Sequence, residues 1–96
     1  MDKTNKQKNK RRKITFTLED IEAKEVHLVG NFNDWNVGAH PMKNVGNGKW
    51  RKQLALPTGK YEYKFMVDGY WMVDPANEQT CPNCFGTYNS IVSLIV

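Results

Sequence analysis

The sequence predicts an all-β protein, an antiparallel β-sandwich of immunoglobulin-like type. Short runs suited to strands recur about every ten residues. Clusters of Gly, Pro, Asn and Asp separate these runs, as turns require. No segment of useful length has the periodicity of a helix. The 96 residues have room for one domain, and a hydrophobic content of 40% is compatible with a packed core.

The first half of the domain is expected to contain two strands and a long loop. Residues 14–18, ITFTL, alternate apolar and polar side chains, which is typical of a half-buried strand. After an acidic connector, VHLVG at residues 26–30 forms the second strand. The stretch GNFNDWN, residues 30–36, is rich in residues that accept turn conformations, so we expect a loop that carries Trp35.

The second half is expected to alternate strands and turns. NVGNG at residues 44–48 is a turn that leads into a strand at 50–56, WRKQLAL. The chain turns again at PTGK, and residues 61–67, YEYKFMV, have the clearest period of two. A loop with two prolines is expected at residues 74–86, and TYNSIVSLIV at residues 87–96 is the final strand.

A hairpin in this half decides where one tryptophan points. Asp68 and Gly69 predict a type I′ turn between YEYKFMV and YWMV. The predicted pairs are Val67 with Tyr70, Met66 with Trp71, Phe65 with Met72, and Lys64 with Val73. Because opposed residues share a face, and the aromatic set of YEYKFMV faces the core, Trp71 is expected outside, beside Met66 and with Lys64 as a diagonal neighbour. The alternative, a register slip that buries Trp71, would expose that aromatic set at ~1.5–3 kcal/mol for each side chain.

Two exposed indoles indicate a binding face. Trp35 lies in a polar loop with no periodic apolar context, and Trp71 is expected on an outer face. A planar ring can stack on a nucleic-acid base or on the C–H face of a sugar. By analogy with base stacking, each such contact is worth ~1–3 kcal/mol.

Basic residues are concentrated at the N-terminus. Residues 1–13 hold five lysines and two arginines against one aspartate, a net charge of +6, whereas residues 14–96 hold seven basic and nine acidic residues, a net charge of −2. We expect a disordered basic tail at residues 1–13 and the folded domain at residues 14–96. Electrostatic attraction of the tail to nucleic acid or anionic lipid is an alternative to a role in solubility, but the tail has no interleaved aromatic residue, which argues against single-strand binding.

No motif indicates a membrane span, a cofactor or catalysis. No apolar run approaches the ~20 residues that span a bilayer, and no apolar segment of a secretory signal follows the basic N-terminus, so we expect a cytoplasmic protein. The motif CPNC, Cys81 to Cys84, supplies two of the four ligands of a zinc site, so reduced or structural thiols are favoured over a disulfide or a metal. A shallow sandwich face is unsuited to the paired carboxylates of a glycosidase, so we expect no enzyme and no cofactor.

Three motifs in order resemble one known family. GNFNDW, GKYEYKFMVDGYWMVDP and FGTYNSIV are similar to segments of the glycogen-binding domain of the AMP-activated protein kinase β subunit, carbohydrate-binding module family 48. The likeness covers residues 14–96 and implies an early-set immunoglobulin-like sandwich that binds α-1,4-glucans such as glycogen or starch. It also implies that Trp35 and Trp71 stack on glucose rings and that Lys64 hydrogen-bonds sugar hydroxyls.

The third motif supplies the remaining site residues that the resemblance implies. Phe85, Thr87 and Asn89 match an aliphatic residue, a threonine and an asparagine that contact the glucan in the family, with Phe85 in place of leucine. The leading hypothesis is therefore a non-catalytic α-glucan-binding module. The alternative is a protein-interaction domain that keeps the fold without binding sugar, with a glycogen-metabolising enzyme or a kinase as its partner.

Overall fold

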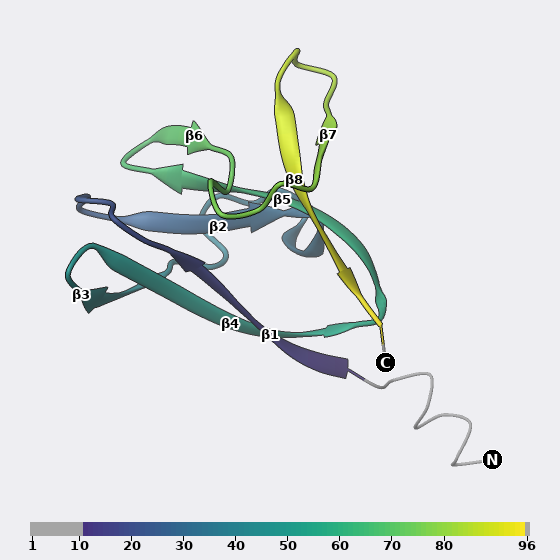
Figure 1. The fold of residues 1–96 in the computed structure, drawn as a ribbon, viewed down its shortest axis with the longest axis horizontal. Coiled ribbons are helices and arrows are strands. Elements are labelled where there is room, and N and C mark those ends of the chain that lie inside the picture. Colours follow the sequence, from purple (N-terminus) through teal and green to yellow (C-terminus); the bar gives the residue numbers. More distant parts are fainter. Residues whose placement is uncertain (1–10, 96) are drawn as a thin grey trace.

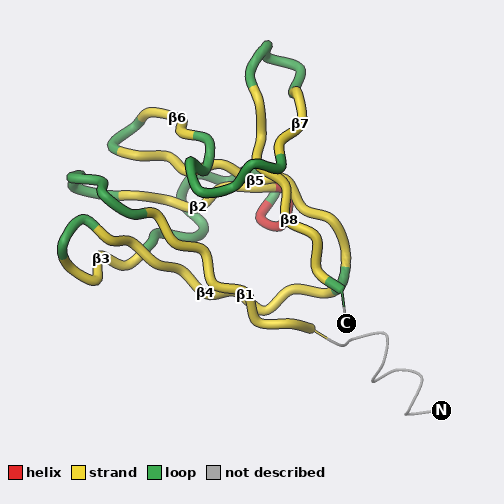
Figure 2. Tube along the Cα trace, in the orientation of Figure 1, coloured by secondary structure: helices red, strands yellow, loops and turns green. Residues whose placement is uncertain are grey.

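Residues 11–95, which the computed structural model describes, form two antiparallel sheets packed face to face (Figure 1). A single-turn 3-10 helix, η1 (Asn31–Asn33), is the segment drawn in red in Figure 2. The predicted all-β sandwich is therefore confirmed. Within the described residues, no helix is long and apolar enough to cross a membrane.

The first sheet contains β1 (Arg11–Leu18), β4 (Lys49–Pro57) and β3 (Lys43–Gly46), in the order β1-β4-β3. β1 begins at Arg11, three residues earlier than expected, because residues 11–13 continue the ladder with the end of β4. This part of the predicted tail therefore belongs to the domain. Residues 1–10, the rest of the predicted tail, lie outside the described residues.

The second sheet contains β2 (Val26–Gly30), β5 (Gly59–Val67), β8 (Tyr88–Leu94) and β7 (Thr80–Pro82), and β6 (Tyr70–Met72) also pairs with β5. β2 pairs with residues 63–67 of β5 along one side. On the other side, β8 pairs with residues 59–63 and β6 with residues 65–67. β6 and β8 therefore follow one another along the same side of β5, and Lys64 lies where they meet.

The core lies between the sheets and draws inward side chains from both. Its buried members are Phe16, Leu18, Val26, Leu28, Met42, Trp50, Tyr63 and Phe65. Tyr63 and Phe65 belong to the face of β5 that was expected to point inward, and Phe65 has no exposed surface. Phe16 of β1 meets Tyr63 edge to face, with ring centroids 4.9 Å apart, so aromatic packing joins the two sheets.

Two short strands were expected as turns or loops. Residues 44–48 were expected as a turn, yet Lys43–Gly46 pairs with β4 as strand β3, with a register shift between Asn44 and Gly46. Residues 74–86 were expected as a loop, yet Thr80–Pro82 pairs with β8 as strand β7. Both strands are largely exposed and rich in Gly, Asn or Pro, so they are held by backbone pairing. Their sequences lack the alternation of apolar and polar residues by which a strand is predicted.

The ends of two strands also differ from the prediction. β6 stops at Met72, so the predicted pair of Lys64 with Val73 does not form. The chain leaves β5 there, and the N–H of Asp74 donates to the side-chain hydroxyl of Ser90 in β8, at 3.0 Å. β8 covers Tyr88–Leu94, within the expected residues 87–96.

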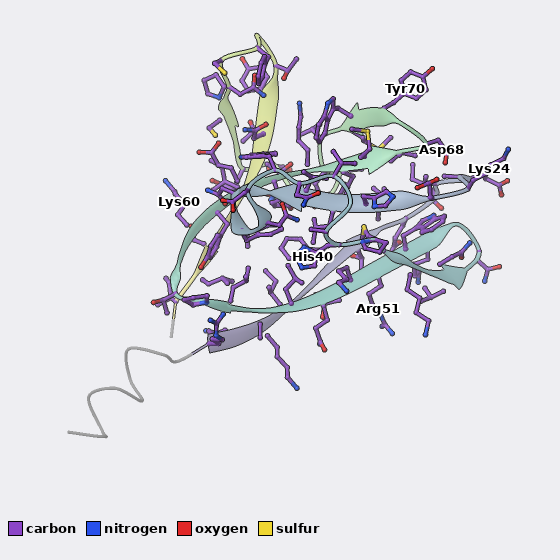
Figure 3. The ribbon with its side chains drawn as sticks, turned by 180° about the vertical axis from the view of Figure 1, so that it is seen from behind. Lys24, His40, Arg51, Lys60, Asp68 and Tyr70 are labelled. Carbon is purple, nitrogen blue, oxygen red and sulfur yellow. The ribbon has the colours of Figure 1, made fainter. Side chains whose placement is uncertain are left out.

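The turn between β5 and β6 is the predicted type I′ turn. Asp68 and Gly69 both have positive φ, at 47° and 87°. The Asp68 carboxylate accepts the backbone N–H of Lys24 at 3.0 Å and of Glu25 at 2.9 Å. Lys24 and Asp68 meet at one end of the molecule in Figure 3. These bonds fix the hairpin against the segment that precedes β2.

Candidate functional site

Trp71 lies on the outer face of the second sheet, as its register predicted. It pairs with Met66, and Phe65 pairs with Met72. The Trp71 side chain is 49% exposed, whereas Phe65 is fully buried. A register slip would reverse both environments, so the alternative in which Trp71 belongs to the core is wrong.

Trp35 sits at the end of a loop with an unusual backbone. Asp34 and Trp35 both adopt the left-handed region, with φ of 55° and 58°. Such residues cost roughly 1–2 kcal/mol each, so surrounding contacts must hold them. One of these contacts is the N–H of Trp35, which donates to the carbonyl of Gly30 at 2.9 Å.

The Asn33 side chain supplies further contacts of the Trp35 loop. Its Oδ1 accepts the N–H of Gly30 at 3.1 Å, and its Nδ2 donates to the carbonyl of Leu28 at 3.1 Å and to Nδ1 of His40 at 2.9 Å. Burial, with a smaller contribution from the charge of Lys52, lowers the pKa of His40. A neutral His40 can accept the bond from Asn33, so this loop is matched to an uncharged imidazole.

Gly30 is required where β2 enters this loop. A Cβ atom at this position would lie 2.5 Å from the carbonyl oxygen of Glu62 and 2.8 Å from the ring of Phe32. The backbone of β5 and the Phe32 ring approach Gly30 so closely that no side chain fits there. This close approach lets the Trp35 loop fold tightly over the end of the second sheet.

The two tryptophans form one exposed aromatic surface with a cation beside it. The ring centroids of Trp35 and Trp71 are 6.5 Å apart, and their planes meet at 71°. Trp35 remains 36% exposed. Lys64 Nζ lies 6.0 Å from the centroid of the Trp71 ring. The loop after β2 and the β5–β6 hairpin thus bring together indoles that are 36 positions apart in the sequence.

Lys64 links this aromatic surface to the β7–β8 hairpin. Its Nζ donates to Oγ1 of Thr87 at 3.0 Å. Thr87 and Asn89 are joined through Asn83, whose Nδ2 donates to Thr87 Oγ1 at 2.8 Å and to Asn89 Oδ1 at 3.0 Å. Thr87 is exposed, whereas Asn89 is 6% exposed. Five of the six predicted site residues therefore belong to one chain of contacts.

Phe85 is the predicted site residue that stands apart. It is 86% exposed in the turn between β7 and β8. Figure 1 shows that this hairpin projects beyond the sandwich, next to the β5–β6 hairpin. The ring is therefore free to meet a ligand that extends from the tryptophans toward the hairpin.

Two polar residues at this surface were not predicted as site residues. Asn83 holds Thr87 and Asn89, and Glu62 Oε1 accepts Asn89 Nδ2 at 3.0 Å. The period of β5 places Glu62 on the same outer face as Lys64, which was a usable signal. For Asn83, the signal was an asparagine in a predicted loop, a residue that commonly bonds the backbone two residues ahead.

Cys81 and Cys84, which flank Asn83, are free thiols. Burial, followed by a hydrogen bond to Glu62 and the charge of Glu62, raises the pKa of Cys81. The thiolate is the reactive form, so this environment makes Cys81 less nucleophilic. Among residues 11–95 there is no group of three or more His, Cys, Asp or Glu that could hold a metal ion.

The geometry suits a neutral ligand with flat apolar faces and polar edges. The indoles of Trp35 and Trp71 offer faces for stacking, and Lys64 and Thr87 lie beside them with hydrogen-bonding groups. The surface is open and shallow. Its cation, Lys64, belongs to β5, whereas its hydroxyl, Thr87, lies in the turn between β7 and β8. Sugar rings, which combine C–H faces with equatorial hydroxyls, have this chemistry.

Curated relatives share part of this chain. It is 49% identical over 53 residues to protein PTST homolog 2, chloroplastic, of Arabidopsis thaliana, a match that covers 55% of this chain and 10% of the relative. It is 39% identical over 71 residues to the 5'-AMP-activated protein kinase subunit beta-1 of Sus scrofa, covering 74% of this chain and 55% of the relative. The human beta-1 subunit gives 39% over 71 residues, with 25% of that protein covered. The chain thus spans between a tenth and just over half of these proteins.

A solved structure and a family model extend the comparison to nearly the whole domain. The maltogenic amylase from S. marinus superimposes with a TM-score of 0.76 over 90% of this chain and 14% of the amylase, at 22% identity, which shows a shared fold. The family model described as the glycogen recognition site of AMP-activated protein kinase matches residues 12–95. The chain therefore belongs to the family of the glycogen recognition site of AMP-activated protein kinase.

Proposed function

We propose that this chain is a non-catalytic module that binds α-glucans of the glycogen or starch type through the outer face of the second sheet. In this proposal Trp35 and Trp71 stack on glucose rings, and Phe85 packs against the glucan from the β7–β8 turn. The residues that hydrogen-bond sugar hydroxyls are Lys64, Thr87 and Asn89.

The observation that carries the proposal is the aromatic surface. The side chains of Trp35 and Trp71 are 36% and 49% exposed, and their centroids lie 6.5 Å apart, with Lys64 beside them. Large aromatic side chains are normally worth burying, at ~1.5–3 kcal/mol each, so packing does not account for their exposure. Membership of the glycogen recognition family supports the choice of ligand.

A shallow surface with few hydrogen bonds binds weakly, so we expect dissociation constants from about 10 µM to millimolar. Isothermal titration with maltoheptaose, and the tryptophan fluorescence change that accompanies it, measures this affinity. Trp71→Ala is expected to weaken binding about fivefold or more, because one stacking contact is worth ~1–3 kcal/mol.

A matched control comes from the residue before Trp71. Tyr70 is 77% exposed and adjacent in the same strand, but its side chain belongs to the other face. Tyr70→Ala should therefore bind maltoheptaose as the unchanged protein does. A native protein that gives no heat and no fluorescence change, or a Trp71→Ala variant of unchanged affinity, would refute the proposal.

We further propose that the module serves a larger glycogen-metabolising enzyme or a kinase and carries no activity itself. The matched relatives include a kinase subunit, and the chain covers 10% to 55% of the relatives described above. Incubation of the chain with amylose is expected to release no reducing sugar above the buffer blank. Release that disappears in Trp71→Ala would instead indicate a hydrolase.

A further inference from the structure

Asn83 is the centre of the turn that carries Phe85 and Thr87. Its side-chain Oδ1 accepts the N–H of Phe85 at 2.9 Å and the N–H of Thr87 at 3.1 Å. Its Nδ2 donates to Thr87 Oγ1 at 2.8 Å and to Asn89 Oδ1 at 3.0 Å. A primary amide has two N–H donors and two acceptor lone pairs, so every hydrogen-bonding position of this side chain is occupied.

The direction of this network is fixed at both ends. Glu62 offers its carboxylate as an acceptor to Nδ2 of Asn89, so Oδ1 of Asn89 must face Asn83. Asn83 must therefore turn its Nδ2 toward Asn89. At the other end, Lys64 is a pure donor and gives one N–H to Thr87 Oγ1 at 3.0 Å.

Thr87 receives two hydrogen bonds as a result. Its Oγ1 accepts from Lys64 Nζ and from Asn83 Nδ2. A hydroxyl has two acceptor lone pairs and one O–H, so the remaining function of the Thr87 hydroxyl is to donate. The side chain is exposed, which leaves that O–H available to a ligand.

We infer that Asn83 is a positioning residue of the glucan site, which holds the β7–β8 turn and makes the Thr87 hydroxyl a donor to the ligand. This inference rests on the proposed glucan-binding function. Where Lys64 meets Thr87, the site then presents donors, the Thr87 O–H and the remaining N–H groups of Lys64. It therefore selects sugar oxygens that accept hydrogen bonds at this point, while Glu62 supplies an acceptor at the far end of the network.

The substitution Asn83→Asp separates the two roles of Asn83. The new carboxylate can still accept the backbone N–H groups of Phe85 and Thr87, but it has lost both donors. The Thr87 O–H then turns toward the carboxylate and is withdrawn from the ligand. We expect maltoheptaose affinity to fall about fivefold, the usual effect of one hydrogen bond, and Thr87→Val, which removes the same donor, to give the same loss.

A double variant tests whether both changes remove one interaction. Asn83→Asp combined with Thr87→Val should bind no more weakly than Thr87→Val alone, because the donor is already absent. Thr87→Ser, which keeps the hydroxyl, should stay within about twofold of the native affinity. Cross-strand nuclear Overhauser effects between β7 and β8 that are retained in Asn83→Asp would show that the turn persists.

Asn44→Asp controls for the added negative charge. Asn44 is exposed in β3 of the first sheet, and its Oδ1 accepts the N–H of Gly46 at 2.8 Å, so it holds a turn in the same manner away from the site. This variant should retain native affinity. An equal loss in Asn44→Asp and Asn83→Asp would mean that charge alone is responsible, and the inference would be wrong.

The results distinguish this inference from the proposed function. If Trp71→Ala loses affinity but Thr87→Val or a folded Asn83→Asp binds as tightly as the native protein, the inference is wrong and the glucan site stands. Losses that multiply in the double variant also overturn it. If the native protein binds no glucan, or Trp71→Ala binds normally, both the function and the inference fall.

Discussion

The outer faces of the two sheets differ sharply although both sheets bury aromatic and aliphatic side chains. The strands β1, β3 and β4 of the first sheet hold seven lysines and arginines and no aspartate or glutamate. Arg51 points from this sheet away from the rest of the sandwich (Figure 3). A shallow hollow of about 410 Å³ on this sheet is lined by Thr15, Lys43, Arg51, Lys52 and Gln53. The second sheet instead exposes indoles.

The comparison shows that packing of the core determines the residue types on only one face of each sheet. Period-two alternation requires apolar residues inside and leaves the outer residues free to follow other demands. Lysines and arginines on the first sheet keep its edge strands solvated and discourage pairing with other chains. No such purpose is served by Trp35 and Trp71, which is why the second sheet indicates a ligand.

The largest expected effect contrasts the two faces directly. Trp35→Ala with Trp71→Ala removes two stacking contacts of ~1–3 kcal/mol each, so affinity for maltoheptaose should fall at least about 30-fold. Lys43→Gln with Arg51→Gln changes the opposite face and should leave affinity within about twofold, because no cation of that face contacts the aromatic surface. Calorimetric titration of both double variants measures this. Comparable losses in the two would show that charge attraction, rather than stacking, dominates binding.

The second prediction concerns buried polar groups, which lie in the second sheet or in the loop that follows β6. The buried polar residues of the described chain are Asp74, Asn89 and Ser90, and none comes from β1, β3 or β4. The Tyr63 hydroxyl donates to Asp74 Oδ2 at 2.6 Å, and burial is the main cause that raises the pKa of Tyr63. Tyr63→Phe leaves the Asp74 carboxylate without this donor, so the free energy of unfolding in urea should fall by about 1–3 kcal/mol.

Tyr61→Phe is the matched control for that measurement. The Tyr61 hydroxyl donates to the carbonyl of Pro57 at 2.7 Å, but the residue is half-buried and no carboxylate depends on it. Its loss should cost about 1 kcal/mol or less. A larger cost for Tyr61→Phe than for Tyr63→Phe would contradict the view that the second sheet depends on its buried polar groups.

The elements that the sequence predicted well are those in which local chemistry and burial agree. YEYKFMV has a clear period of two and is followed by Asp68 and Gly69, so both the strand and its type I′ register follow from the sequence. The outward position of Trp71 is a direct consequence. β3 and β7 were missed because each has one exposed edge and turn-like residues, and only backbone pairing with the next strand of its hairpin makes it a strand.

The site was predictable only in part for the same reason. The position of Trp71 beside Lys64 depends on one hairpin, whereas the approach of Trp35 to Trp71 depends on how a loop folds across the sheet. The Asn83 network depends on a hairpin whose first strand, β7, was not predicted. Sequence periodicity carries no information about such contacts, because they join segments without regular spacing.

The third prediction is that the free energy of unfolding depends on pH through His40, which lies between Lys52 of the first sheet and the Trp35 loop. Burial and then Lys52 of β4 lower the pKa of His40, which accepts a bond from Asn33, the residue that holds the Trp35 loop. The unfolded chain therefore binds a proton more readily than the folded protein. The free energy of unfolding should fall as pH drops from His40's ordinary value of 6.5 toward its lower folded pKa, and should be insensitive to this group above 6.5.

His40→Gln tests this origin of the pH dependence, because glutamine keeps an acceptor without titrating. Urea unfolding of the variant should show a flatter response between neutral and mildly acidic pH. Lys52→Met should reduce the response as well, by removing the smaller of the two causes. A native slope retained in His40→Gln would place the titrating group elsewhere.

The smallest expected effect concerns repulsion among the lysines and arginines on the outer face of the first sheet, which should lower the free energy of unfolding. Lys43 lies directly opposite Arg51, and both side chains are exposed. Like charges at opposed positions destabilise a sheet, and opposite charges there contribute roughly 0.2–1 kcal/mol. Lys43→Glu should therefore raise the free energy of unfolding by a few tenths of a kcal/mol up to about 1, and the gain should shrink at high salt. Glucan affinity should not change. A gain in stability at unchanged affinity would show that the two faces are energetically separate. A loss of stability would mean that the cations of the first sheet stabilise the fold by contacts beyond their mutual repulsion.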